Sequence, residues 1–114
     1  MERYLGLDVH AASSTLVVLS EAGRRLKRCV LETNGQALVE VIRMIPGRKH
    51  LCFEEGTQSA WLYEILSPQV QETVVAMLRY RRGQKNDALD AYMLAEKLRT
   101  GQIERQVFKA PGQF

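Results

Sequence analysis

The stretch YLGLDVHAASSTLVVLSEAGRRLKRCVLE, residues 4–32, decides the fold. Three apolar or alternating segments, at 3–8, 14–20 and 25–32, lie in or just before it, and a Glu-Ala-Gly turn at 21–23 separates the last two. Aliphatic and β-branched residues bounded by turn residues are typical of strands. The N-terminal part of the chain therefore predicts an antiparallel meander of three strands.

Helical and strand-like segments alternate after this meander. The predicted elements are a helix over 35–44 capped by Asn34, a strand at 49–54, a helix over 59–66, a strand at 73–77, and a helix that Asn86 caps and that runs to about Thr100. The helices are predicted from the 3.6-residue spacing of apolar side chains, from good N-cap residues and from the Pro or Gly residues that end them. The strand at 73–77 is expected at the centre of the sheet.

The predicted order is β-β-β-α-β-α-β-α. Strands that enter a sheet through helical crossovers pair in parallel, so a mixed sheet follows the antiparallel meander. This pattern matches an α/β fold of the ribonuclease H-like (RuvC-like) kind. We expect one domain over 1–102, and a linker or the start of a further region over 103–114.

Composition narrows the class of protein. The chain has 114 residues, 46% hydrophobic and 25% charged, which is ordinary globular usage for one domain. No apolar run approaches the roughly 18 residues of a membrane helix, and no signal-peptide pattern opens the chain. The two cysteines, Cys29 and Cys52, fit buried thiols better than a metal pair. These features predict a cytoplasmic protein.

Four acids stand where a metal-dependent site would need them. Asp8 and Glu54 each end an apolar strand, and Asp87 and Asp90 lie three residues apart in the last predicted helix, on one face of it. Carboxylates of this kind are ligands for Mg²⁺ or Mn²⁺. Each acid also has an ordinary interpretation, as a turn residue or as a first-turn acid that favours the helix dipole. Glu55 remains an alternative to Glu54.

Basic residues form two clusters. Arg79, Arg81, Arg82 and Lys85 precede the last predicted helix, where they could bind nucleic-acid phosphates close to the acids. The other cluster contains Arg24, Arg25, Lys27 and Arg28. Basic clusters can bind phosphates, but at a net charge of +3 they are more often a solvated face.

Three segments give the chain a resemblance to a known family: YLGLD at 4–8, FEEGT at 53–57 and KNDALDAYMLA at 85–95. They resemble the N-terminal DEDD domain of bacterial insertion-sequence transposases, a group related to Piv-type DNA invertases. The resemblance covers nearly the whole chain, and its D-x-x-D-A-x-x-L-A pattern is the most specific part. It implies a DEDD tetrad made of Asp8, Glu54, Asp87 and Asp90.

The resemblance further implies DNA cleavage and rejoining during transposition, with Mg²⁺ or Mn²⁺ as cofactor and DNA as partner. A structured guide RNA takes part in some family members, and we expect a homo-oligomer. The family's second domain supplies a serine nucleophile, and no serine here matches it, so these residues alone are expected to be inactive or weakly active. The alternatives are a RuvC-like Holliday-junction nuclease and a truncated, non-catalytic domain that binds DNA or self-associates.

Overall fold

The computed structural model describes residues 1–77, 90–103 and 105–106. Their secondary structure consists of six strands, three α-helices and one short 3₁₀ helix, in the order β1 (Glu2–Val9), β2 (Ser13–Leu19), β3 (Arg25–Glu32), α1 (Gly35–Arg43), β4 (Arg48–Glu54), α2 (Ser59–Leu66), η1 (Ser67–Gln69), β5 (Glu72–Ala76), α3 (Ala91–Thr100) and β6 (Arg105–Gln106). The mixed α/β class predicted from the sequence is confirmed. The 3₁₀ helix η1 and the two-residue strand β6 were not predicted.

All six strands form one sheet in the order β3-β2-β1-β4-β5-β6. β1, β2 and β3 form the predicted antiparallel meander, and β4 and β5 join β1 in parallel. The prediction that the strand at 73–77 is central was wrong. Among the described strands, β1 and β4 lie at the centre, and β5 has only the short β6 beyond it. An apolar run shows that a strand is buried on both faces, but not how many neighbours it has.

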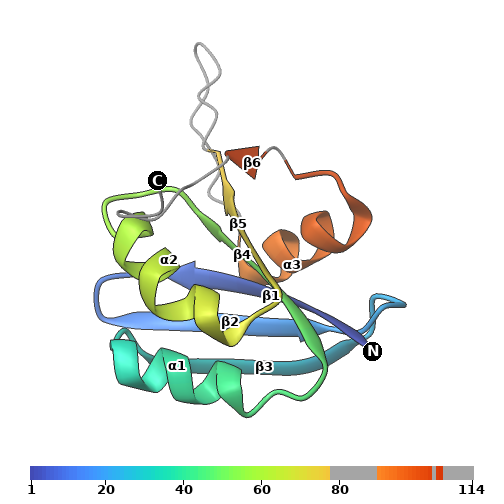
Figure 1. Cartoon of the computed structure of the whole chain (residues 1–114), viewed down its shortest axis with the longest axis horizontal. Coiled ribbons are helices and arrows are strands. Elements are labelled where there is room, and N and C mark those ends of the chain that lie inside the picture. Colours follow the sequence, from blue (N-terminus) through green and yellow to red (C-terminus); the bar gives the residue numbers. More distant parts are fainter. Residues whose placement is uncertain (78–89, 104, 107–114) are drawn as a thin grey trace.

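Helices cover both faces of this sheet (Figure 1): α1 and α2 lie on one face and α3 on the other. Alternation along the strands assigns each side chain to a face. Leu5, Leu7 and Phe53 point into the larger core under α1 and α2, whereas Cys52 and Val74 pack against α3. Burying one such leucine or phenylalanine contributes about 1.5–3 kcal/mol, so these two layers hold the helices onto the sheet.

The helix α1 begins where the sequence predicts. The Asn34 side chain accepts a hydrogen bond from the backbone N–H of Ala37 at 3.1 Å, and Leu38 and Ile42 are buried one turn apart. This arrangement satisfies an N–H group that has no partner within the helix. Within the described residues, no helix is long and apolar enough to cross a bilayer.

Candidate functional site

Asp8 and Glu54 lie at the same edge of the sheet. β1 and β4 run in parallel with Leu7 opposite Phe53, so the next position on each strand carries one of these acids. Their neighbours two residues earlier, Gly6 and Cys52, face α3, and side chains alternate along a strand. Asp8 and Glu54 are therefore on the α3 side, at the carboxyl ends of the two central strands.

The helix α3 packs directly on the backbone of β1. A Cβ added at Gly6 would collide with the carbonyl oxygen of Ala91 and would lie 2.6 Å from the backbone nitrogen of Ala95. Only glycine permits so close an approach of helix to strand. The first turn of α3 is thereby placed beside the end of β1 that carries Asp8.

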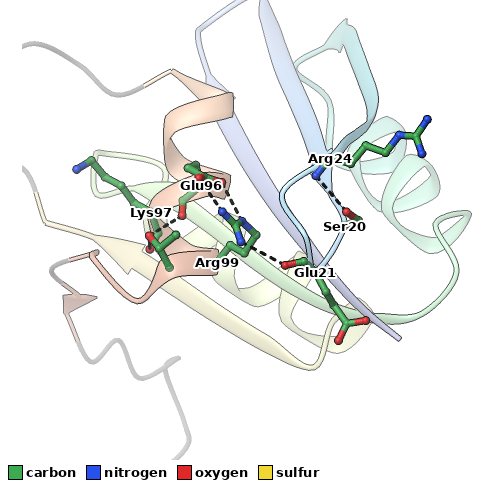
Figure 2. Close-up of polar contacts among 7 residues, drawn as sticks. Ser20, Glu21, Arg24, Glu96, Lys97 and Arg99 are labelled. Atoms are coloured by element: carbon green, nitrogen blue, oxygen red, sulfur yellow. Dashed lines mark hydrogen bonds and ion pairs between the residues drawn. The ribbon is translucent and has the colours of Figure 1, made fainter.

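Arg99 attaches the other end of α3 to the sheet (Figure 2). Its guanidinium donates hydrogen bonds to both carboxylate oxygens of Glu96, at 2.9 and 2.8 Å, and one to the backbone carbonyl of Glu21, at 3.2 Å. Glu21 lies in the turn between β2 and β3. The Arg99 hydrogen bonds hold the pKa of Glu96 below its ordinary value, and the same contacts raise the pKa of Arg99.

Asp90 is the N-cap of α3 and lies outside the helix. Its backbone is extended (φ −78°, ψ 173°), and its Oδ1 accepts a hydrogen bond from the backbone N–H of Met93 at 2.8 Å. The predicted helix start at Asn86 was therefore wrong. Aspartate competes well for the cap position, so the helix begins after Asp90. Asp90 is therefore not on a helix face that it could share with Asp87, as predicted, and Asp87 itself lies outside the described residues.

Asp8 and Asp90 line one hollow of about 180 Å³ on the surface. It lies between the first turn of α3 and the strands β1 to β3, and its other lining residues are Thr15, Val17, Arg25, Arg28, Ala91 and Tyr92. The Asp8 side chain is 24% exposed, and its Oδ2 lies 3.2 Å from His10 Nε2. Two carboxylates that are far apart in the sequence thus line one surface hollow.

This pair of acids suits a hard divalent cation in its chemistry. Mg²⁺ is commonly held by one or two carboxylates together with waters and a substrate phosphate. Over residues 1–77, 90–103 and 105–106, no three His, Cys, Asp or Glu side chains lie close enough together to hold a metal ion. The described part of the hollow therefore supplies two candidate ligands and no complete ligand set.

Glu54 and Glu55 differ in their surroundings. Glu54 is the last residue of β4, paired with Ala76 of β5, and it is absent from the residues lining the hollow. The backbone N–H of Glu55 donates to the carbonyl of Ala76 at 2.9 Å, which extends the pairing by one residue. Alternation then places the Glu55 side chain on the face opposite to α3, away from Asp8.

The predicted phosphate-binding loop, with Arg79, Arg81, Arg82 and Lys85, lies outside the described residues. Two arginines of the other basic cluster, Arg25 and Arg28, line the hollow instead. Sequence reasoning interpreted that cluster as a solvated face. The register between β2 and β3 determines which face of the sheet carries Arg25 and Arg28, and this register depends on where the β2–β3 hairpin turns.

A second polar cluster, at the opposite end of the sheet, was not predicted. The Nε2 of His50 lies 2.6 Å from a carboxylate oxygen of Glu2, and its Nδ1 lies 2.7 Å from one of Glu72. The ring also stacks on Tyr4, with centroids 5.1 Å apart. The hydrogen bond from His50 is the main reason that the pKa of Glu2 is below its ordinary value. This cluster links β1, β4 and β5 at their amino ends.

Comparison with known proteins gives the class of this protein. A family model for transposases, DEDD_Tnp_IS110, matches residues 5–113. The chain therefore belongs to the transposases, and within them to the IS110-type family, of which it matches the N-terminal DEDD domain. This confirms the resemblance found in the sequence.

No curated protein matched the sequence. Among solved structures, the chain is similar to the ethanolamine utilization protein EutJ from Carboxydothermus hydrogenoformans, with a TM-score of 0.44 and 11% sequence identity. That similarity covers 64% of this chain and 36% of the EutJ chain.

Proposed function

We propose that this chain is the metal-dependent DNA-cleaving domain of an IS110-type transposase, with Asp8, Glu54, Asp87 and Asp90 as its acidic tetrad. One observation carries the proposal: Asp8 and Asp90 line the same hollow at the carboxyl ends of the central strands, in a chain of a transposase family. The proposed substrate is DNA, and the proposed place of action is the bacterial cytoplasm. Involvement of a guide RNA and a homo-oligomeric state remain predictions from the resemblance.

The arrangement of the sheet supports a ribonuclease H-like fold for this domain. An antiparallel meander is followed by two parallel strands that enter through helical crossovers, and α3 closes the face that carries the acids. In such a sheet, ligands bind outside the carboxyl ends of the parallel strands. The proposed site is at that edge.

Neighbouring residues hold the side chains of Asp8 and Asp90 in place. His10 contacts one oxygen of Asp8, and the N–H of Met93 binds Oδ1 of Asp90, which fixes the Asp90 side chain while Oδ2 is available to a ligand. A bound Mg²⁺ or Mn²⁺ would supply activation of the attacking oxygen and neutralisation of the leaving oxygen. Positioning of that charge would fall to Asp8 and Asp90, with Glu54 and Asp87 as further proposed ligands.

Calorimetric titration with Mn²⁺ tests the metal site. We expect the Asp8→Asn/Asp90→Asn variant to bind at least tenfold more weakly than the wild type, because both carboxylates lose their charge. The matched control is Glu40→Gln/Glu64→Gln, which removes the same charge from exposed positions on α1 and α2 across the sheet. Equal affinity of the wild type and the Asp8→Asn/Asp90→Asn variant would refute the site.

A plasmid-nicking assay tests the reaction itself. We expect slow Mn²⁺-dependent conversion of supercoiled to nicked DNA by the wild type, with none by Asp8→Asn/Asp90→Asn. Cleavage that persists in the double variant would place the chemistry elsewhere.

A further inference from the structure

The α3-side face of β3 continues from the hollow to the edge of the sheet. α3 packs on β1, β2 and β4, and β3 lies beyond them as the edge strand. Val17 and Leu19 of β2 face α3, and their partners in the register on β3 are Arg28 and Arg25. Both arginines are exposed and both line the hollow.

No side chain of the described fold neutralises the charge of these two arginines. Over residues 1–77, 90–103 and 105–106, neither guanidinium forms an ion pair or a hydrogen bond with another side chain. By contrast, Arg99 and Arg48 are paired with carboxylates. A surface that holds two unpaired guanidinium groups beside one hollow is suited to an anion, and the planar fork of arginine matches a phosphate in geometry.

The two arginines place positive charge beside the two acids, where a negatively charged DNA strand would need it. Asp8 and Asp90 repel a phosphodiester, so a nucleic-acid strand that approaches the hollow needs positive charge next to them. Arg25 and Arg28 provide two positive charges on the part of the hollow that β3 lines. Tyr92, 42% exposed, lines the same hollow and presents an aromatic ring on which a base can stack.

We propose that Arg25 and Arg28 form a phosphate-binding face that holds the backbone of a DNA strand and delivers it to Asp8 and Asp90. The inference rests on the proposed function and adds to it a second DNA contact, on β3, besides the basic residues predicted before α3. These contacts are sequence-independent, because phosphate contacts position a duplex or strand without reading its bases.

Fluorescence anisotropy with a labelled single-stranded DNA of about 20 nucleotides, in EDTA and over a series of KCl concentrations, tests this face. We expect Arg25→Gln/Arg28→Gln to weaken binding at least tenfold at low salt. The slope of log K against log salt is negative, and each lost phosphate contact should make it less steep by about 0.7. The slope of the double variant should therefore be less steep by about 1.4. Circular dichroism spectra should match those of the wild type, and Arg25→Lys/Arg28→Lys should restore the slope.

The matched control is Lys27→Gln/Arg43→Gln. Lys27 is on the same strand but pairs with Val18, whose side chain is in the core under α1 and α2, so it occupies the other face of the sheet. Arg43 is in the last turn of α1, on that face as well. The control removes two positive charges, as the test variant does, and should keep wild-type affinity and slope. Equal losses in the two double variants would overturn the inference, because net charge alone would then explain both.

Binding in EDTA separates this inference from the proposed metal chemistry. If the wild type binds Mn²⁺ no better than Asp8→Asn/Asp90→Asn, but DNA binding is lost only in Arg25→Gln/Arg28→Gln, the phosphate-binding face stands and the proposed metal site fails. If the wild type cuts DNA and Arg25→Gln/Arg28→Gln binds as the wild type does, the face is refuted. Tighter binding of an RNA strand of the same sequence would assign the face to RNA and overturn DNA as its occupant.

Discussion

Gly6 of β1 lies so close to Ala91 of α3 that no side chain fits between strand and helix. This contact connects the two halves of the candidate site, because Asp8 follows Gly6 by two residues and Asp90 precedes Ala91 by one. The distance between the acids therefore depends on a position that carries no functional group.

Replacing Gly6 with alanine should displace α3. The added methyl group meets backbone atoms, which cannot rotate away, and over-packing of this kind costs about 1–3 kcal/mol. Urea denaturation should show this loss. Gly56→Ala is the control, because nothing lies within 4 Å of a Cβ at that position. A Gly6→Ala protein as stable as the wild type would show that α3 packs less closely than described.

Two substitutions of Asp90 should separate its contribution to stability from its contribution to metal binding. Asp90→Ala removes the N-cap hydrogen bond to Met93 and should cost about 0.5–2 kcal/mol in thermal or urea unfolding. Asp90→Asn keeps an oxygen acceptor at the cap and removes the charge, so it should unfold like the wild type but bind Mn²⁺ more weakly. Equal destabilisation by both variants would contradict the role of Asp90 as a cap.

Glu54 and Glu55 should differ in their effect on metal binding. Glu54→Gln is expected to weaken Mn²⁺ binding several-fold, because alternation along β4 puts Glu54 on the α3 face with Asp8. Glu55→Gln removes the same charge from the opposite face and should leave the titration unchanged. A larger effect of Glu55→Gln would assign the ligand to Glu55.

Acid should weaken the cluster around His50. The pKa of Glu2 in the folded protein is below its ordinary value of 4.5, first because of the hydrogen bond from His50. The ionised carboxylate therefore favours the folded state above pH 4.5, and this contribution is lost as the pH falls through the lowered pKa.

The difference in melting temperature between the wild type and Glu2→Gln should accordingly be largest near neutral pH and disappear at low pH. Glu64→Gln, an exposed position on α2, serves as the control and should melt like the wild type throughout. A constant difference between wild type and Glu2→Gln from pH 7 to pH 3 would exclude the contribution of this carboxylate.

Local patterns predicted the elements well where one signal dominated. Residues 25–32 alternate and lie between clear turns, and β3 has those bounds; Asn34 caps α1 as expected. The start of α3 was misplaced because two good caps, Asn86 and Asp90, compete in the sequence, and cap propensity alone does not rank them.

The sequence indicated the edge of the sheet where Asp8 and Glu54 lie, but it did not indicate that Arg25 and Arg28 line the hollow beside Asp8. Asp8 and Glu54 could be assigned to one edge because parallel strands end together. Assigning Arg25 and Arg28 to that site needs the β2–β3 register, and a shift between Val18 and Leu19 interrupts the simple alternation there. A one-residue slip moves a strand's side chains to the other face, so the sequence alone does not determine which basic residues meet the acids.

Cys52 makes the attachment of α3 open to kinetic measurement. Its side chain is fully buried in the cluster that also contains Leu94 and Leu98 of α3, whereas the only other cysteine, Cys29, is partly exposed. Lifting α3 from the sheet would expose this thiol to a reagent, so the labelling rate of Cys52 reports the free energy of local opening around it. The chain thus contains its own probe for the movement that would separate Asp8 from Asp90.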